Sequence, residues 1–187
     1  MAEKIESLME IQRKDEENKR QLEIATLQAQ INPHFLYNTL DAIVWLIETK
    51  KNEEAEEMVT SLSTYFRSFL SNGKDIITLG EEVQHVRSYL EIQQVRYRDI
   101  LRYEIDVDPS IESCLIPKMT LQPLVENAIY HGIKPKRGVG LLRVTGTKSG
   151  GFATLCVEDS GVGMTPGELE ELRRKVDGED ETSFGLV

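Results

Sequence analysis

The sequence is poor in cysteine and lacks a long apolar run, and both absences limit what the protein can be. Only two cysteines occur among the 187 residues, Cys114 and Cys156, each inside an apolar stretch. Neither has a metal-ligand neighbour at a useful spacing, so we expect buried, reduced thiols rather than a disulfide. No stretch of about 18 apolar residues and no signal peptide is present. We therefore expect the chain as given to be soluble and cytoplasmic.

Basic residues are also in deficit. The 22 Lys and Arg residues face 32 Asp and Glu residues, which gives a formal net charge of −10 and a pI near 4.9. Nucleic acids and anionic membranes carry the same sign, so neither is an expected partner. The length of 187 residues and hydrophobic content of 40% fit one or two globular domains with a core of their own. Any phosphate ligand must therefore be held by local groups.

Residues 28–40, QAQINPHFLYNTL, place a proline beside a histidine in a helical pattern. Apolar residues recur at three- and four-residue steps in two sets: Ile24, Leu27, Ile31 and Phe35, then Leu36, Leu40, Ile43, Val44 and Ile47. The pattern predicts that the helix continues through Pro33, although an internal proline costs roughly 3 kcal/mol. The two sets cover nearly opposite faces, as in a helix of a bundle. His34 lies at the edge of the first face. It is either a histidine at the bundle surface that is reachable from outside, or a core histidine beside a tolerated kink at Pro33.

Residues 3–30 are nearly free of Gly and Pro and rich in charged residues and Gln. Their heptad pattern is interrupted at Asp15 and Lys19. A weak coiled coil and a plain solvated helix both remain open for this segment. We assign residues 1–27 to a signalling helix.

A second helix is expected from Asn52, an N-cap followed by two acids, to Asn72-Gly73. Two antiparallel helices with more apolar surface than one partner can cover should form a dimeric four-helix bundle. We therefore predict a homodimer built on a helical hairpin over residues 28–74.

The composition changes at about residue 75. Thr78 and Glu81 predict a capping box that opens a third helix. Short β-rich runs follow over residues 102–107, 141–147 and 152–157, with a turn at 149–151 and a helix over about 119–131. Helices and mostly antiparallel strands in separate runs indicate an α+β two-layer sandwich over residues 75–187.

Residues 30–38, QINPHFLYN, resemble the phosphoacceptor box of LytS-like sensor histidine kinases. The resemblance implies that His34 takes a phosphoryl group from ATP and passes it to the receiver domain of a response regulator. It also implies a membrane sensor segment that is not in this chain. The commoner histidine kinases place an acid after the histidine, where this chain has Phe35. We hypothesise that Asn38, one turn on, orients the other ring nitrogen of His34.

Two later motifs resemble boxes of the GHKL superfamily of ATP-binding kinases and ATPases. Residues 121–132, LQPLVENAIYHG, resemble its N box, and residues 157–164, VEDSGVGM, its first glycine box. The resemblance implies ATP and Mg²⁺, with Asn127 as the Mg²⁺ ligand and Asp159 accepting a hydrogen bond from the adenine amino group. Gly161 and Gly163 would let the backbone approach the nucleotide. Alone, the aspartate-glycine pattern is a common turn; together and in this order the boxes indicate a nucleotide site.

Further candidates flank the N box. Glu126 is a candidate polarising acid, and we expect His131, four residues past Asn127, to line the site from the same helix face. Lys134, with Lys136 and Arg137, either reaches phosphates or belongs to a solvated turn. His85 stands among polar neighbours in the third helix and receives no role.

Two departures from the superfamily pattern bear on activity. Pro123 stands where the ATPase branch has a water-activating Glu, which disfavours hydrolysis. Residues 182–186 resemble the second glycine box, with Gly185 and Leu186 as nucleotide contacts, but Ser183 replaces a glycine and the chain stops at Val187. We expect a C-terminally incomplete ATP-binding domain whose lid, or disordered tail, spans residues 165–183. The alternatives are a degenerate kinase acting as a dimeric scaffold and a GHKL ATPase.

Overall fold

The computed structural model describes residues 33–70 and 75–176. The helix expected over residues 3–30, the turn expected at Asn72-Gly73 and the second glycine box lie outside these residues. The chain divides into two compact units, Met1–Ala55 and Glu56–Val187. This division falls inside the second helix rather than near residue 75, so the predicted domain division stays a prediction.

Helix α2, Pro33–Glu48, is the first described element of the first unit. Pro33 is the first described residue of this helix. The passage of the helix through Pro33 concerns residues outside those described. Four α2 side chains are buried: Phe35, Thr39, Ile43 and Leu46. Five large apolar side chains are exposed: Tyr37, Leu40, Val44, Trp45 and Ile47. The helix thus has apolar residues on its open side as well as on its buried one.

The C-terminus of α2 is closed by backbone hydrogen bonds of the Schellman type. Lys51 N–H donates to the Leu46 carbonyl at 2.8 Å, and Lys50 N–H donates to the Ile47 carbonyl at 3.0 Å. The motif needs one residue in the left-handed region, and Lys50 takes that place with φ of 60°. A lysine therefore occupies a position that usually holds glycine.

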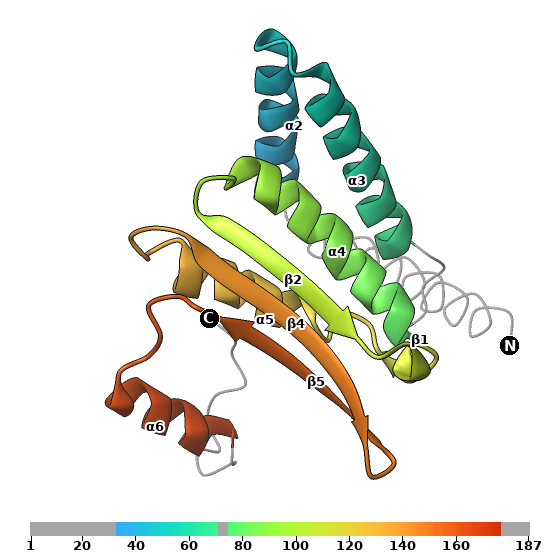
Figure 1. The fold of residues 1–187 in the computed structure, drawn as a ribbon, viewed down its shortest axis with the longest axis vertical. Coiled ribbons are helices and arrows are strands. Elements are labelled where there is room, and N and C mark those ends of the chain that lie inside the picture. The colour runs from blue at the N-terminus through green and yellow to red at the C-terminus, as the bar shows by residue number, and fades with distance from the viewer. Residues whose placement is uncertain (1–32, 71–74, 177–187) are drawn as a thin grey trace, which may run out of the picture. The chain divides into compact units, whose positions relative to one another are not determined.

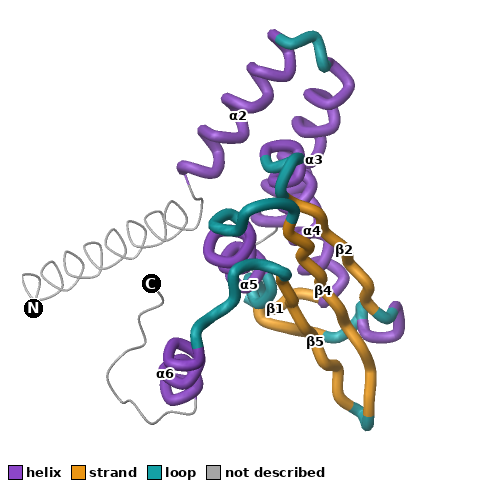
Figure 2. Tube along the Cα trace, turned by 60° about the vertical axis from the view of Figure 1, so that its left-hand side comes forward, coloured by secondary structure: helices purple, strands orange, loops and turns teal. Residues whose placement is uncertain are grey.

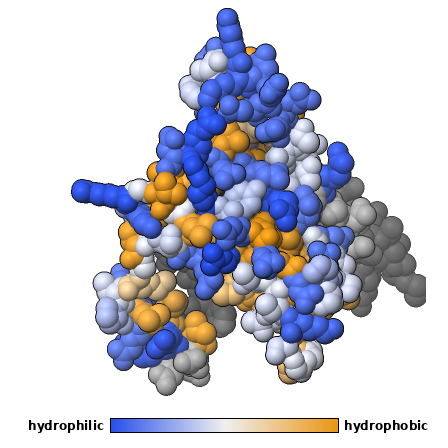
Figure 3. All heavy atoms as spheres, viewed as in Figure 1, coloured by the Kyte–Doolittle hydropathy of each residue, from blue (hydrophilic) through white to orange (hydrophobic). Residues whose placement is uncertain are grey.

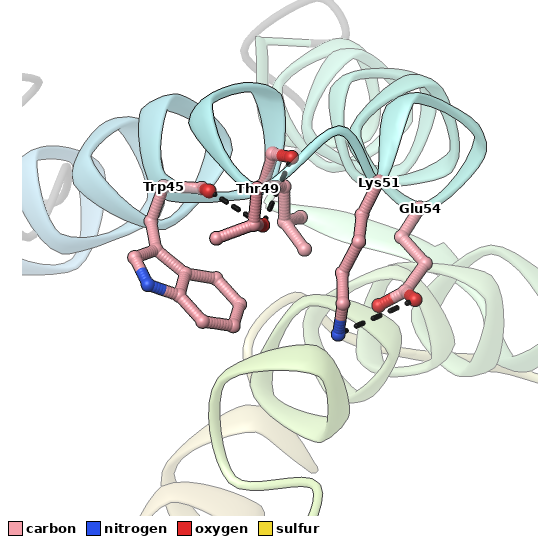
Figure 4. Close-up of polar contacts among 5 residues, drawn as sticks. Trp45, Thr49, Lys51 and Glu54 are labelled. Atoms are coloured by element: carbon pink, nitrogen blue, oxygen red, sulfur yellow. Dashed lines mark hydrogen bonds and ion pairs between the residues drawn. The ribbon is translucent and has the colours of Figure 1, made fainter.

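Side chains support the same turn (Figure 4). The Thr49 hydroxyl donates to the Trp45 carbonyl at 2.8 Å, and Lys51 Nζ lies 3.7 Å from a Glu54 carboxylate oxygen. The Lys51 ammonium also lies 5.3 Å from the centre of the Trp45 ring. These contacts hold the chain where it leaves α2.

Helix α3, Asn52–Leu70, includes Asn52 itself, which was expected to be its N-cap. The Lys51 carbonyl accepts the first helical hydrogen bond, from Ala55 N–H at 3.1 Å, so Asn52 is the first helical residue rather than the N-cap. Glu53 and Glu54 lie in the first turn, as expected from the favourable interaction of acids with a helix N-terminus.

In the second unit, strand β1, Ile76–Thr78, leads directly into helix α4, Leu79–Arg96, and pairs antiparallel with strand β3, Leu115–Pro117. The predicted capping box is confirmed. Thr78 N–H donates to the Glu81 carboxylate at 2.7 Å, and Glu81 N–H donates to the Thr78 hydroxyl at 3.2 Å.

Three strands form the main sheet in the order β2-β4-β5: β2, Leu101–Val107; β4, Gly140–Ser149; and β5, Phe152–Asp159. The β4–β5 pair is antiparallel, with Gly150 and Gly151 in its turn at positive φ. The β2–β4 pair is parallel, so the expectation of mostly antiparallel strands was wrong for it. The chain between these strands, including the short helix η1, Pro109–Ile111, and helix α5, Gln122–Asn127, carries the crossover that a parallel pair requires.

One face of this sheet is covered by helices, and no element among the described residues covers the other (Figures 1 and 2). Leu101, Leu142 and Val144 are fully buried on the covered face, where α4 packs on β2 and the segment after α5 packs on β4 and β5. On the open face, Arg143 Nε donates to Glu104 at 2.9 Å. This two-layer arrangement agrees with the predicted α+β class.

Both cysteines are free but exposed, so their predicted burial was wrong. Cys156 lies on β5, an edge strand whose outer face no described residue covers. Cys114 lies in the loop between η1 and β3. Leu155 and Val157, the apolar neighbours of Cys156, alternate with it along the strand, and Leu115, next to Cys114, is itself exposed.

The helix predicted over residues 119–131 runs instead as α5, Gln122–Asn127, followed without a break by the π-helical turn η2, Ala128–Ile133. Met119 has a left-handed backbone with φ of 63°, which no helix accommodates. The helix therefore begins three residues later than predicted. Among residues 33–70 and 75–176, no helix combines the length and apolarity that a bilayer crossing demands.

Candidate functional site

The two motifs that are predicted to bind nucleotide, the N box and the first glycine box, contact each other at glycine residues, and we call this contact the interlock. A Cβ on Gly132, in η2, would lie 2.8 Å from Cγ of Asp159, at the end of β5. A Cβ on Gly161 would overlap the carbonyl group of Gly132. Val162 N–H donates to that same carbonyl at 3.0 Å. The end of the N box and the start of the glycine box thus touch, backbone against backbone, in a space that admits no side chain.

The Asp159 carboxylate is exposed, and one of its two oxygens accepts a hydrogen bond. Its Oδ1 accepts a hydrogen bond from Gly161 N–H at 2.8 Å, which fixes the carboxylate at the mouth of the loop. The hydrogen bonds of the described residues leave its Oδ2 available to an outside donor such as an amino group. Gly163 follows with φ of 67° and open space around its Cα, so this loop turns where a side chain would be strained.

The predicted Mg²⁺ ligand, Asn127, is the last residue of α5 and is exposed. His131, one turn on, is exposed as well, whereas Glu126 is half-buried and accepts a hydrogen bond from Gln122 Nε2 at 2.9 Å. The described residues contain no group of three or more His, Cys, Asp or Glu side chains that could hold a metal alone. A hard cation at Asn127 would therefore take its other oxygens from phosphates and water, as Mg²⁺ usually does.

The two lysines after the N box have different surroundings. Lys134 Nζ lies 4.7 Å from the ring centre of Tyr130 and 5.3 Å from that of Tyr97, a cation–π arrangement. Lys136 Nζ donates to the Ser160 carbonyl at 2.5 Å and so lies against the glycine loop. The structure therefore brings Lys136 to the loop and holds Lys134 over two rings.

Behind α5, a buried polar cluster runs along α4, and the sequence reading missed it. His85 is only 3% exposed and stacks on Tyr65 of α3, so its expected polar surroundings were wrong. Burial, with the charge of Lys118, lowers the pKa of His85 to about 4. Gln93 Nε2 donates to the Tyr89 hydroxyl at 2.7 Å, and burial and then the charge of Glu126 raise the pKa of Tyr89. The available signal was the four-residue spacing of positions 85, 89 and 93, which share a helix face.

The histidine box lies in the first unit. His34 is exposed as the second residue of α2, and Asn38, one turn later, is half-buried. The Asn38 Nδ2 group is buried without a hydrogen-bond partner among the described residues, so its orienting role remains a hypothesis.

Helix α6, Pro166–Val176, lies within the predicted lid. Thr165 and Glu168 cap its start, with Thr165 N–H donating to the Glu168 carboxylate at 2.7 Å. None of its residues is buried, and apolar side chains are visible over it in the lower left of Figure 3. The exposed large apolar side chains of α6 are Leu169, Leu172 and Val176. The rest of the predicted lid, and Ser183, Gly185 and Leu186 of the second glycine box, lie outside the described residues.

Comparison with known proteins gives a consistent set of relatives. A family model described as "Histidine kinase" matches residues 22–101. Sensor histidine kinase YesM of Bacillus subtilis (strain 168) is 41% identical over 170 residues, covering 91% of this chain and 30% of that protein. Sensor protein LytS of the same organism is 36% identical over 154 residues, covering 82% and 26%. Sensor histidine kinase BtsS of Escherichia coli (strain K12) is 37% identical over 140 residues, covering 75% and 25%. The chain therefore spans less than a third of the length of these relatives.

Proposed function

This chain belongs to the LytS-like sensor histidine kinases, and from that premise we propose that His34 is phosphorylated from ATP and passes the phosphoryl group to an aspartate of a response regulator. The observation that carries the proposal is the interlock of Gly132 with Asp159 and Gly161. It joins two motifs that lie about thirty residues apart in the sequence into one surface, with Asp159 at its mouth. A chance pair of turns would have no reason to meet.

The nucleotide would be held by exposed groups around this interlock. Asp159 would accept from the adenine amino group, and the backbone at Gly161 and Gly163 would approach the sugar and phosphates. Asn127 would hold Mg²⁺, which neutralises phosphate charge when bound. His131 and Glu126 flank Asn127 on the same helical segment. For the lysines we give Lys136 the better claim to a phosphate, because its Nζ already lies against the glycine loop, whereas that of Lys134 lies over two rings.

The residues of the first unit support the role of nucleophile. His34 is exposed, so its ring can be reached by a phosphate donor. A neutral imidazole presents a nucleophilic nitrogen without a strong base nearby. Positioning and charge neutralisation would then supply most of the rate.

We further propose that the chain forms a homodimer and docks a receiver domain. The support is the exposed apolar side of α2, formed by Leu40, Val44, Trp45 and Ile47. Such a row on one helix is more than a monomer normally leaves in water. Light scattering on the chain and on a Val44→Asp variant tests this, with a dimer expected for the first and a monomer for the second.

Two other functions share these features. A scaffold that dimerises without binding ATP is kept open by Ser183 in the second glycine box. A nucleotide-induced rise in melting temperature would argue against it. A GHKL ATPase is disfavoured because Pro123, at the start of α5, cannot accept a proton from water. Release of free phosphate without labelled protein would favour it again.

The deciding experiment is incubation with γ-labelled ATP and Mg²⁺, followed by a test for acid-labile, base-stable label. We expect label on the wild type and on a control variant, Asp41→Asn, at another exposed position of α2. We expect none on His34→Gln. Label retained on His34→Gln would refute His34 as the acceptor, and no label on any variant would favour the scaffold.

A further inference from the structure

Glu82, in the first turn of α4, is a carboxylate with no exposure to solvent. Burying a charged group is costly unless hydrogen bonds replace its water. Here two backbone donors do so. Glu82 Oε2 accepts from Met119 N–H at 3.1 Å, and Glu82 Oε1 accepts from Leu121 N–H at 2.9 Å. The carboxylate therefore reaches across to a segment almost forty residues further along the chain.

The segment that Glu82 binds has no cap of its own. Leu121 stands at the N-cap position of α5 and offers no side-chain acceptor. Thr120 is not a cap, because its hydroxyl donates to the Pro117 carbonyl at 2.6 Å. Met119 has a left-handed backbone that its side chain disfavours. The start of α5 thus depends on an acceptor supplied by another helix.

The distance from this start to the nucleotide site is short. Leu121 and Asn127 are six residues apart, which is about 9 Å along a helix. The segment between them carries Glu126 and ends at Asn127. A rotation or slip at Leu121 would therefore move the Asn127 side chain directly.

We propose that Glu82 is a positioning residue of the nucleotide site: its carboxylate caps α5 from α4 and so fixes the place of Asn127 relative to Asp159. This inference rests on the function proposed above. It assigns Glu82 no contact with nucleotide or metal. Its effect should appear in the Mg²⁺-dependent part of nucleotide affinity, since Asp159 is held separately by Gly161.

The neighbouring acid provides a matched control. Glu81 also accepts backbone N–H, but from Thr78 at the start of its own helix. Glu81→Gln weakens a cap at α4, whereas Glu82→Gln weakens the cap at α5. The two variants make the same chemical change at adjacent positions.

The test has two readouts on the intact chain. Amide hydrogen exchange reports the cap itself: in Glu82→Gln we expect faster exchange at Leu121 and Val125, and in Glu81→Gln no change there. Titration with ATP, with and without Mg²⁺, reports the effect of this cap on nucleotide affinity. We expect Glu82→Gln to lose roughly tenfold in affinity with Mg²⁺ and little without it, and Glu81→Gln to match the wild type in both.

Each outcome decides the proposal. Unchanged exchange at Leu121 in Glu82→Gln would overturn the cap, whatever the nucleotide does. Faster exchange with an unaltered Mg²⁺-dependent affinity would overturn the positioning role. Equal losses with and without Mg²⁺ would mark a general structural role and overturn it too. A wild type that binds no nucleotide would refute the proposed function, and the positioning role with it, while the exchange result would still decide whether Glu82 caps α5.

Discussion

The imidazole of His85 stacks on the ring of Tyr65, with ring centres 4.5 Å apart and planes inclined by 21°. The stack joins α3 to α4 inside the second unit. His85 is almost fully buried there, so its protonated form would lose the water that solvates its charge. Burial first, and the charge of Lys118 second, lower its pKa to about 4.

This pKa predicts a loss of stability in mild acid. An unfolded histidine takes up its proton near pH 6.5, whereas folded His85 does so near pH 4. Between these values the unfolded state binds more protons than the folded state. The stability that buried, neutral His85 contributes is therefore complete above pH 6.5 and is lost as the pH falls toward 4. At pH 5 the expected loss is about 2 kcal/mol relative to pH 7. Urea unfolding of the wild type and of His85→Phe measures it, and equal pH dependence in both would refute the assignment.

Gly132→Ala should damage the nucleotide site. Its Cβ would press on the Asp159 carboxylate, which must then leave the position set by Gly161. We expect about 1–3 kcal/mol of lost stability from this overpacking and a loss of ATP affinity. Gly167→Ala is the control, because a Cβ there meets nothing within 4 Å. Calorimetric titration with ATP compares the two, and equal affinities would contradict the interlock.

Lys50→Gly should stabilise the turn after α2. Lys50 pays for a left-handed backbone that glycine adopts without steric cost. We expect a gain of about 0.5–1 kcal/mol in the free energy of unfolding. The same change at Lys51, whose backbone is not left-handed, should destabilise instead or have no effect. Chemical denaturation of both variants checks the sign.

Asn38 allows its two possible roles to be separated. Its Nδ2 is buried without a partner among the described residues, and such a group costs about 1–3 kcal/mol. Asn38→Leu should therefore leave stability equal or higher. If Asn38 orients His34 during transfer, phosphorylation should nevertheless fall in Asn38→Leu and in Asn38→Ala. Normal labelling of Asn38→Ala would refute the orienting role.

Local signals in the sequence predicted the elements well. The capping box of Thr78 and Glu81 and the glycine turn at 150–151 are present as expected. Both follow from residues close together in the chain. The predicted strands also lie within a few residues of β2, β4 and β5.

The features of the fold that the sequence did not predict depend on contacts between residues far apart in the chain. The parallel pairing of β2 with β4 depends on a crossover of more than thirty residues. The hydrogen bonds from Met119 N–H and Leu121 N–H tie the start of α5 to Glu82, far away in the chain. The exposure of Cys156 depends on which strand lies at the edge of the sheet. None of these carries a signature at its own position.

The candidate site divides in the same way. Its motifs predicted which residues matter, and their meeting at Gly132 required the fold. The engagement of Lys134 with Tyr97 and Tyr130 could not be read from the loop sequence, because Tyr97 belongs to another part of the chain.

The turn between β4 and β5 has a practical use. Gly150 and Gly151 have positive φ and open space around them, and the chain on either side is exposed. Loop tips of this kind accept inserted peptides with little effect on the fold. An epitope or a small fluorophore-binding tag placed there would mark the protein in cells without touching His34, Asn127 or Asp159.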